Sequence, residues 1–307
     1  MKALVTGCAG FIGSHVVDRL LDEKYVVLGI DRFSDYYERS IKEANLRQVS
    51  NNPRFTLIDE DILKISEFPK VDYIFHLAAQ AGVRSSWGKS FEIYLRDNVG
   101  ATQKLLEFYK DKNIKKFVYS SSSSVYGNSS LPMREDIPVR PISPYGVTKL
   151  AAENLCYLYY LNYGVPTVSL RYFTVYGPRQ RPDMAINKFT SAIREGRPIP
   201  LYGDGTQTRD FTFVTDIVEA NLLAAHHPES GEIYNIGGGN RISVNDIIKE
   251  IENGVNKKAL IQHIEFQKGD VQDTLADTTK AGRELGWRPR VPISEGMEKY
   301  LRISLNG

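Results

Sequence analysis

A glycine-punctuated turn near the start of the chain restricts the fold more than any other feature of the sequence. Gly7, Gly10 and Gly13 follow the apolar run Lys2 to Thr6 and precede a stretch with apolar residues at helical spacing. A strand, a glycine-rich turn and a helix in this order let the backbone approach a pyrophosphate closely, with the first N–H groups of the helix facing the phosphates. The arrangement predicts the first unit of a dinucleotide-binding α/β fold.

An acidic residue at the end of the second expected strand, Tyr25 to Ile30, indicates which dinucleotide binds. Asp31 can accept hydrogen bonds from the adenosine ribose and would repel the 2′-phosphate of NADP, so we predict NAD as the cofactor. Arg32 follows directly and offers a charge that would neutralise such a phosphate, which leaves NADP as the alternative. We expect Asp61, just past the third strand, to hold the adenine amine, with a solvated surface carboxylate as the alternative.

Strand and helix patterns alternate through the first half of the chain. Strands are expected at Phe55 to Ile58, Tyr73 to Leu77, Phe117 to Ser120 and Thr167 to Arg171, a helix is expected around Asn98 to Tyr109, and a long helical pattern runs from Tyr145 to Tyr163. Strands that alternate with helices favour a parallel sheet with helices on both faces. We therefore predict an α/β fold with a doubly wound parallel sheet.

The alternation weakens from Tyr172 onward, where loops such as YGPRQRP and YGDGTQTRDF suit a substrate-binding cap. A helical pattern from Asp216 to Ala225 and a buried strand pattern from Ile233 to Ile236 predict that the chain then returns to the sheet. The two domains should therefore be interleaved. The expected division is a dinucleotide-binding domain over residues 1–171 and 216–236, and a substrate-binding domain over residues 172–215 and 237–307.

Composition and charge exclude several classes of partner. The chain has 39 basic and 37 acidic residues, a formal net charge of +2, which shows no excess that would attract nucleic acid or a membrane surface. Its two cysteines, Cys8 and Cys156, fit a reducing compartment, and the histidines lack the spacing of metal ligands. No leader-like or membrane-spanning apolar segment is visible. We expect a cytoplasmic protein with a small-molecule ligand and no metal site.

A tyrosine and a lysine four residues apart, Tyr145 and Lys149, share one face of the long helix. A tyrosine with a pKa of about 10 is a poor base at neutral pH, but a nearby ammonium and a cationic nicotinamide favour the phenolate. The phenolate can then transfer a proton. The same spacing is common on ordinary amphipathic helices, so the catalytic interpretation depends on the glycine turn and on the serines that follow Tyr119.

Six motifs in order along the chain resemble the extended short-chain dehydrogenase/reductase superfamily, in its nucleotide-sugar epimerase and dehydratase branch. The motifs are TGCAGFIGSH, HLAAQAGVRSS, SSSSVYG, PYGVTK, RYFTVYGPRQRP and YGDGTQTRDF, and the resemblance extends to ELGWRP near the C-terminus. It implies a Rossmann-type N-terminal domain, a smaller C-terminal nucleotide-sugar domain and a tightly held NAD. It also implies a homodimer built from helices such as the one that bears Tyr145.

The same resemblance implies the roles of individual residues, beginning with a catalytic triad of Ser122, Tyr145 and Lys149. The residues implied to contact the cofactor are Gly7, Gly10, Phe11, Ile12, Gly13, Asp31, Asp61, Ile62, Leu77, Ala78, Ala79, Asn98, Tyr145, Lys149 and Tyr172. Those implied to contact a UDP-sugar, with Arg209 on the diphosphate and no single role for Arg84, are Arg84, Ser123, Ser124, Thr174, Arg181, Asn187, Lys188, Tyr202, Arg209 and Asp270.

Two positions in the serine run favour epimerisation over elimination. Sugar dehydratases of this branch resemble one another in having an Asp-Glu pair where this chain has Ser123 and Ser124, and UDP-xylose synthases have a glutamate at the second position. Without either acid, dehydration lacks its general acid and base. We expect instead that Tyr145 takes the proton of the sugar 4-hydroxyl, that the C4 hydride passes to NAD, and that a 4-keto intermediate turns over before the hydride returns.

The identity of the sugar depends on the RYFTVYGPRQRP segment. Galactose epimerases usually have asparagine at the position of Thr174, whereas Thr174 together with Arg181 is similar to UDP-glucuronate 4-epimerases. An arginine fork and a threonine hydroxyl can bind the C5 carboxylate, and this would suppress loss of carbon dioxide from a β-keto acid. We therefore predict conversion of UDP-glucuronate to UDP-galacturonate. The alternatives are a UDP-glucose or UDP-N-acetylglucosamine 4-epimerase, arginines that only contact the diphosphate or solvent, and a non-catalytic NAD sensor.

Overall fold

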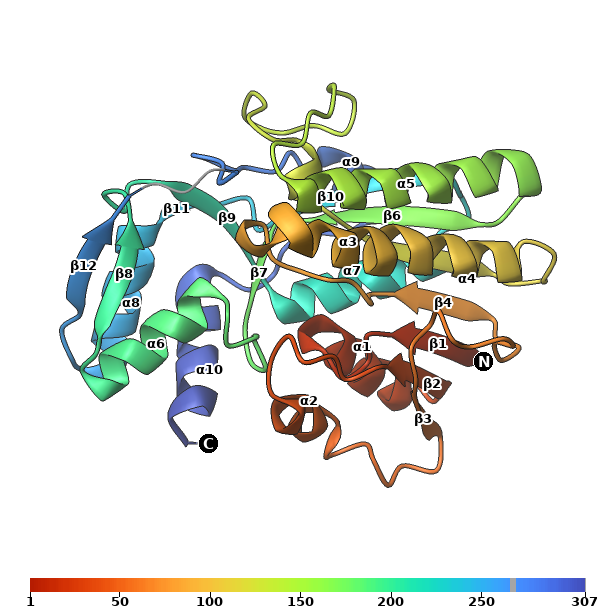
Figure 1. Ribbon diagram of the computed structural model, residues 1–307, viewed down its shortest axis with the longest axis horizontal. Coiled ribbons are helices and arrows are strands. Elements are labelled where there is room, and N and C mark those ends of the chain that lie inside the picture. The colour runs from red at the N-terminus through yellow and green to blue at the C-terminus, as the bar shows by residue number, and fades with distance from the viewer. Residues whose placement is uncertain (266–268, 307) are drawn as a thin grey trace.

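The computed structural model describes residues 1–265 and 269–306, and a seven-stranded parallel sheet forms the centre of this part of the chain (Figure 1). The strand order is β10-β6-β5-β4-β1-β2-β3. The order reverses between β1 and β4, and ligands of such sheets bind at the carboxyl ends of the strands beside this point. The strands are β1 (Lys2–Thr6), β2 (Val26–Asp31), β3 (Phe55–Asp59), β4 (Tyr73–His76), β5 (Lys116–Ser122), β6 (Thr167–Tyr172) and β10 (Glu232–Ile236).

Helices cover both faces of this sheet, because successive residues of its strands point in opposite directions. Ala3 and Val5 belong to the apolar core beneath α1 and α7, while Leu4 belongs to the core beneath α4 and α5. The predicted doubly wound α/β fold is confirmed. The elements on this part of the molecule are α1 (Phe11–Asp22), α2 (Arg39–Leu46), α3 (Phe91–Tyr94), the π-helix η3 (Leu95–Gly100), α4 (Ala101–Tyr109), α5 (Pro144–Tyr163) and α7 (Val214–His226), with the short 3₁₀ turns η1 (Arg84–Ser86), η2 (Gly88–Ser90) and η4 (Ser123–Val125).

The remaining strands form two smaller sheets beside the main one (Figure 1). Among the described residues, one sheet has the order β11-β9-β7 and the other pairs β12 with β8, while β10 returns the chain to the main sheet next to β6. The domain boundaries given above stay a prediction. These elements are β7 (Thr174–Tyr176), β8 (Pro198–Tyr202), β9 (Thr208–Phe213), β11 (Arg241–Ser243), β12 (Leu260–Ile264), α6 (Ala185–Glu195), α8 (Val244–Val255), α9 (Thr279–Glu284) and α10 (Ile293–Asn306).

Across residues 1–265 and 269–306, none of the helices combines the length and the apolar character that crossing a membrane requires.

Candidate active site

The turn between β1 and α1 leaves no room for a side chain at Gly7, and α1 leaves none at Gly13. A Cβ atom on Gly13 would lie 2.1 Å from the carbonyl oxygen of Gly7. Gly7 itself has a φ of +69°, and a Cβ there would lie 2.9 Å from the backbone of Ala78. Helix α1 therefore packs closely on the strand, and the N–H groups at its start remain open to a ligand.

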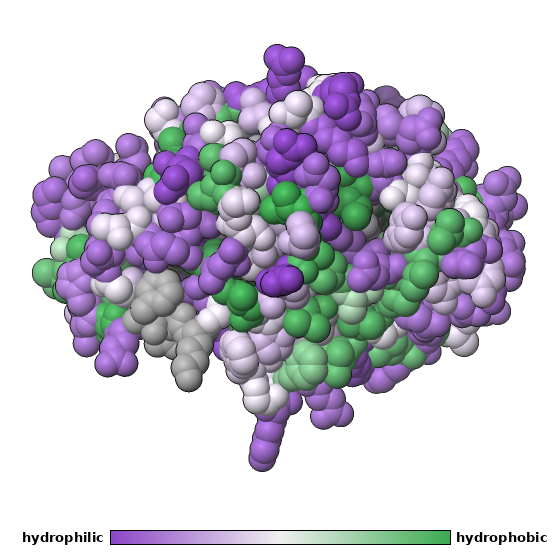
Figure 2. Space-filling model, turned by 90° about the horizontal axis from the view of Figure 1, so that it is seen from above, coloured by the Kyte–Doolittle hydropathy of each residue, from purple (hydrophilic) through white to green (hydrophobic). Residues whose placement is uncertain are grey.

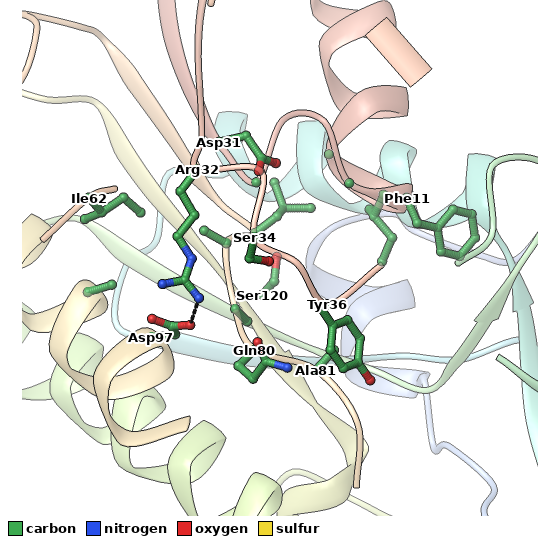
Figure 3. A pocket seen from close by; sticks show the side chains of 18 of the residues that line it. Phe11, Asp31, Arg32, Ser34, Tyr36, Ile62, Gln80, Ala81, Asp97 and Ser120 are labelled. Atoms are coloured by element: carbon green, nitrogen blue, oxygen red, sulfur yellow. Dashed lines mark hydrogen bonds and ion pairs between the residues drawn. The ribbon is translucent and has the colours of Figure 1, made fainter. Parts of the chain in front are cut away.

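The first cavity extends from this turn along the carboxyl ends of the strands (Figure 3). Apart from Asn98, every residue predicted to contact the cofactor lines it. Asn98 is buried behind the wall, where its amide donates to the carbonyl of Gln80 at 3.1 Å and to the hydroxyl of Thr148 at 2.9 Å. Asn98 thus ties the cavity wall to α5, and the cofactor role of the whole set stays a prediction.

Asp31 sits at the end of β2 with both carboxylate oxygens facing backbone donors. Its Oδ2 accepts from the Ala9 N–H at 3.1 Å and its Oδ1 from the Phe33 N–H at 2.9 Å. Burial raises the pKa of Asp31, while the Phe33 N–H and the positive charge of Lys42 oppose that rise. The carboxylate is therefore held in place at the edge of the cavity, where the sequence predicts a ribose partner.

Several lining residues were not predicted from the sequence to contact a ligand, and most of them come from segments outside the expected strands and helices. Tyr36 and Tyr37 stand in the loop after β2, and Lys42 follows on α2. Their neighbours carry no periodic pattern, so only tertiary packing brings them to the cavity. The full set is Ile30, Arg32, Ser34, Tyr36, Tyr37, Lys42, Glu60, Gln80, Ala81, Asp97, Ala101, Ser120 and Ser121.

The predicted triad comes together at the end of β5. Helix α5 begins with Pro144 in its first turn, and the Ser143 hydroxyl caps it by accepting from the Gly146 N–H at 3.1 Å. This start places Tyr145 near Ser122, whose side chain lowers the pKa of the phenol. The Ser122 hydroxyl also accepts from the Ser124 N–H at 3.1 Å, which fixes its position.

Burial shifts the pKa values of the two titratable triad members in opposite directions. It raises the pKa of Tyr145, and the side chain of Ser122 and the charge of Arg181 lower it in part. It lowers the pKa of Lys149 to about 8. The Lys149 ammonium faces the ring of Tyr119, 4.6 Å from its centroid. Arg181 therefore adds a positive charge that acts on Tyr145, and the catalytic role of Lys149 stays a prediction.

A second cavity lies next to the first and contains half of the predicted substrate residues, namely Ser123, Ser124, Thr174, Arg209 and Asp270. Ser121 lines the first cavity and Ser123 lines the second, so Ser122 stands where the two meet. The triad hydroxyl itself lines neither cavity, but it lies between two residues that do. The other lining residues of the second cavity are Val83, Ile142, Ser143, Gly269, Val271 and Thr274.

Arg181 lines the first cavity rather than the second, close to Tyr145. Its Nε and Nη2 donate to the two oxygens of Asp183 at 2.9 and 3.0 Å. Thr174, its expected partner in binding a carboxylate, stands at the start of β7 and lines the second cavity. The two residues therefore flank the triad from different chambers.

Arg84 links the two parts of the molecule beside the second cavity. Its guanidinium donates to Asp270 at 3.0 and 2.6 Å and lies 3.7 Å from the centroid of the Tyr202 ring. Asn187 and Lys188, both on α6, line neither of the two cavities. The substrate roles of these five residues remain predictions.

In the described part of the chain, no group of three or more histidine, cysteine, aspartate and glutamate side chains is arranged to hold a metal ion.

Comparisons with known proteins agree over nearly the whole length. The family model described as GDP-mannose 4,6 dehydratase matches residues 4–300. A Bacillus subtilis protein named uncharacterized UDP-glucose epimerase YtcB is 43% identical over 302 residues, covering 97% of this chain and 96% of that protein. UDP-glucuronate 4-epimerase of Thermodesulfobacterium geofontis is 43% identical over 309 residues, covering 98% and 95%.

Among solved structures, UDP-glucuronic acid 4-epimerase from Bacillus cereus, in complex with UDP-glucuronic acid and NAD, superposes with a TM-score of 0.96. The two sequences are 42% identical, and the match covers 100% of this chain and 99% of that one. The chain therefore belongs to the GDP-mannose 4,6 dehydratase family, the nucleotide-sugar epimerase and dehydratase branch of the short-chain dehydrogenases/reductases that the sequence motifs predicted.

Proposed function

We propose that this protein is an NAD-dependent UDP-glucuronate 4-epimerase, which interconverts UDP-glucuronate and UDP-galacturonate. One observation carries the proposal. The Ser122–Tyr145 pair stands where the glycine-walled cavity meets a second cavity whose serine-run positions, Ser123 and Ser124, bear hydroxyls instead of acids. Redox-neutral inversion at C4 needs the pair and a hydride acceptor, whereas elimination of water needs additional acid–base groups. The bound ligands of the Bacillus cereus neighbour support the same choice.

The first cavity fits NAD on its own geometry. Gly7 and Gly13 allow the start of α1 to pack closely on the strand, which leaves its first N–H groups open to a pyrophosphate, and Asp31 is held at the edge of the same cavity. When bound, NAD supplies a reversible acceptor for the C4 hydride. Since the hydride must return to the same sugar, the cofactor has to stay in place through the whole cycle.

The side chains of this protein supply the proton transfer and the positioning. Tyr145 accepts the proton of the sugar 4-hydroxyl, and Ser122 holds the same oxygen by a hydrogen bond. Lys149 supplies the positive charge that favours the phenolate. Arg181 supplies a second positive charge near Tyr145. This charge lowers the pKa of the phenol and opposes the rise caused by burial.

The carboxylate of the sugar requires a cationic partner, and Arg181 with Thr174 is the pair that we assign to it. Arg181 donates through Nε and Nη2 to the carboxylate of Asp183, which fixes the orientation of the guanidinium. Its third nitrogen, Nη1, lies outside this fork and is available to a second carboxylate. Capture of the carboxylate would hold the 4-keto intermediate in a geometry that disfavours decarboxylation.

The experiment that tests the proposal is a comparison of substrates. Purified protein is assayed on UDP-glucuronate, UDP-glucose and UDP-N-acetylglucosamine, with products separated by chromatography. We expect UDP-galacturonate from the first and little turnover of the neutral sugars. Activity confined to neutral UDP-sugars would favour the alternative suggested by the name of the Bacillus subtilis relative. Release of a UDP-pentose would indicate a decarboxylase instead.

We also propose that the protein works as a homodimer in the cytoplasm. Helix α5 and the neighbouring α3 and η3 expose large apolar side chains, and Figure 2 shows hydrophobic residues gathered in a band on the face of the molecule where α5 lies. A stripe of this kind is typical of a protein–protein interface. The two unpaired cysteines support a reducing compartment. The exposed apolar residues of the stripe are Ile93, Leu95, Val147, Tyr157, Leu158, Tyr160, Leu161 and Tyr163.

A further inference from the structure

Four charged side chains close one end of the first cavity in a ring of ion pairs. Arg32 reaches from the end of β2 to Asp97 of η3, with its Nη2 2.5 Å from Asp97 Oδ2 (Figure 3). Its Nη1 lies 3.4 Å from Oδ2 of Asp61, which follows β3. Arg96 completes the ring through its Nη1, 2.7 Å from Asp97 Oδ1, and through its contact with Asp61. Each carboxylate of this charged ring therefore lies between two guanidinium groups.

The charged ring is partly shielded from water. The side chains of Asp61 and Asp97 are each 12% exposed, whereas those of Arg32 and Arg96 are 30% and 38% exposed. Asp61 Oδ1 also accepts from the Leu63 N–H at 2.9 Å, which fixes the carboxylate. Two positive and two negative groups balance one another. The acids form the inner part of the ring and the arginines its outer part.

The position of the charged ring relates it to the adenosine half of the dinucleotide. Arg32, Asp61 and Asp97 all line the first cavity, and Arg32 directly follows Asp31, the predicted ribose partner. The ring joins three segments that are far apart in the sequence, the loops after β2 and β3 and the π-helix η3. It therefore joins three chain segments at the wall of the cavity.

We propose that the charged ring is a clasp that retains the adenosine half of the cofactor and discriminates against a 2′-phosphate. Arg32 is the cation best placed in sequence to neutralise a 2′-phosphate, but both of its terminal nitrogens already face carboxylates. A phosphate in this region would meet the negative charges of Asp31, Asp61 and Asp97, while the guanidinium of Arg32 is already paired. The ammonium of Lys42, which also lines this cavity, already donates to Ser34. The clasp supplies the cofactor retention on which the proposed epimerisation depends.

Two substitutions of the clasp should shift cofactor preference in opposite directions. Asp97→Asn removes one negative charge and releases Arg32, so the affinity for NADP relative to NAD should rise by about tenfold, the size of one charge-assisted hydrogen bond. Arg32→Ala leaves the negative charges of Asp61 and Asp97 in excess, so the affinity for NADP relative to NAD should fall. Both variants open the clasp, so both should release NAD several times faster than the wild type. A purely structural role would weaken both dinucleotides equally.

The test measures binding without sugar, on protein stripped of endogenous dinucleotide. Calorimetry gives the affinities for NAD and NADP, and stopped-flow fluorescence gives the rate of NAD release. Asp136→Asn is the matched control, because Asp136 pairs with Arg134 and lines neither cavity, and this variant should behave like the wild type.

The proposal is wrong if both variants change the affinities for NAD and NADP equally, or if they release NAD at the wild-type rate. The two variants are predicted to change the affinity for NADP relative to NAD in opposite directions. Each prediction can be tested alone, so one variant that folds is sufficient. If the wild type binds NAD and the variants keep the wild-type ratio of NADP and NAD affinities, the clasp is refuted and the epimerase proposal is unaffected. A wild type that does not bind NAD refutes both.

Discussion

At the scale of single residues, each serine of the run Ser120 to Ser124 has its own environment. The hydroxyl of Ser120 lies 3.1 Å from that of Tyr172, and Ser121 donates to Glu153 at 2.6 Å. Ser122 accepts from the Ser124 N–H at 3.1 Å and lowers the pKa of Tyr145, and the last two serines line the second cavity. A run that resembles low-complexity sequence is therefore a row of specific contacts, because a strand end directs successive side chains to different sides.

The pH dependence of turnover is predicted from the lysine of the triad. Burial lowers the pKa of Lys149 to about 8, so its ammonium is present below that pH and is lost as the pH rises through it. Since the charge favours the Tyr145 phenolate, kcat/KM should decline on the alkaline side near pH 8. The profile is measured by initial rates on UDP-glucuronate from about pH 6 to about 10, because kcat/KM reports groups of the free enzyme.

Lys149→Arg is the control for this profile. Arginine keeps its proton throughout the measured range, so the variant should turn over more slowly but should lack the alkaline decline. If the wild type and the variant decline at the same pH, the lysine is not the group responsible.

At the scale of elements, a buried ion pair fixes α5 against the sheet. Arg171 of β6 donates through Nε and Nη2 to the two oxygens of Glu153 at 3.0 and 2.6 Å, and the two side chains are only 3% and 2% exposed. Glu153 stands one turn beyond Lys149 on α5. The Arg171 Nη1 also donates to the Tyr126 hydroxyl at 2.8 Å. The pair therefore sets how the catalytic helix lies over β5 and β6.

Removal of one partner of this pair should cost more stability than removal of both. Glu153→Gln leaves the Arg171 charge buried without its counter-ion, and we expect a loss of about 3 kcal/mol in the free energy of unfolding. The double variant Glu153→Met, Arg171→Met removes both charges, so its loss should be smaller. Urea denaturation followed by circular dichroism measures both, and a double variant less stable than the single one would contradict the prediction.

The sequence predicted the regular elements well, because their signals are local. Helix α5 was expected from Tyr145 to Tyr163 and runs from Pro144 to Tyr163, between a serine cap and the left-handed Gly164. The helical pattern expected from Asn98 differs, since η3 begins at Leu95 as a π-helix. There the side chain of Asn98 bonds to Gln80 and Thr148, which are distant in sequence. Such tertiary contacts leave no trace in a local pattern.

At the scale of the whole molecule, the exposed apolar stripe predicts self-association. Leu158 and Leu161 of α5 are 49% and 62% exposed and stand three residues apart, on one side of the helix. Leu158→Glu with Leu161→Glu should convert a dimer to a monomer by burying charge at the interface. Sedimentation velocity at micromolar concentration measures this. The matched control is Leu260→Glu, at a leucine of β12 that is 56% exposed and lies outside the stripe.

A wild type that sediments as a monomer, or a double variant that remains dimeric, would show that the stripe is not a dimer interface.

The arrangement of the site across the molecule was predictable only in part. The glycine turn, Asp31 and the triad come from motifs with short spacing, and the structure brings them to adjoining cavities. The charged partners of Arg32, and the pairing of Arg84 with Asp270, join segments 29 to 186 residues apart. Pairing over such distances depends on the folded sheet, so single-sequence patterns could not reveal it.

The central claim is reversible oxidation at C4 with return of the same hydride, and an isotope experiment tests it most directly. UDP-glucuronate with deuterium at C4 is incubated with the protein in ordinary water, and the product is examined by nuclear magnetic resonance and mass spectrometry. The account predicts UDP-galacturonate that retains deuterium at C4, with no net NADH and no carbon dioxide. Loss of the label to solvent, or a decarboxylated or dehydrated product, would contradict it.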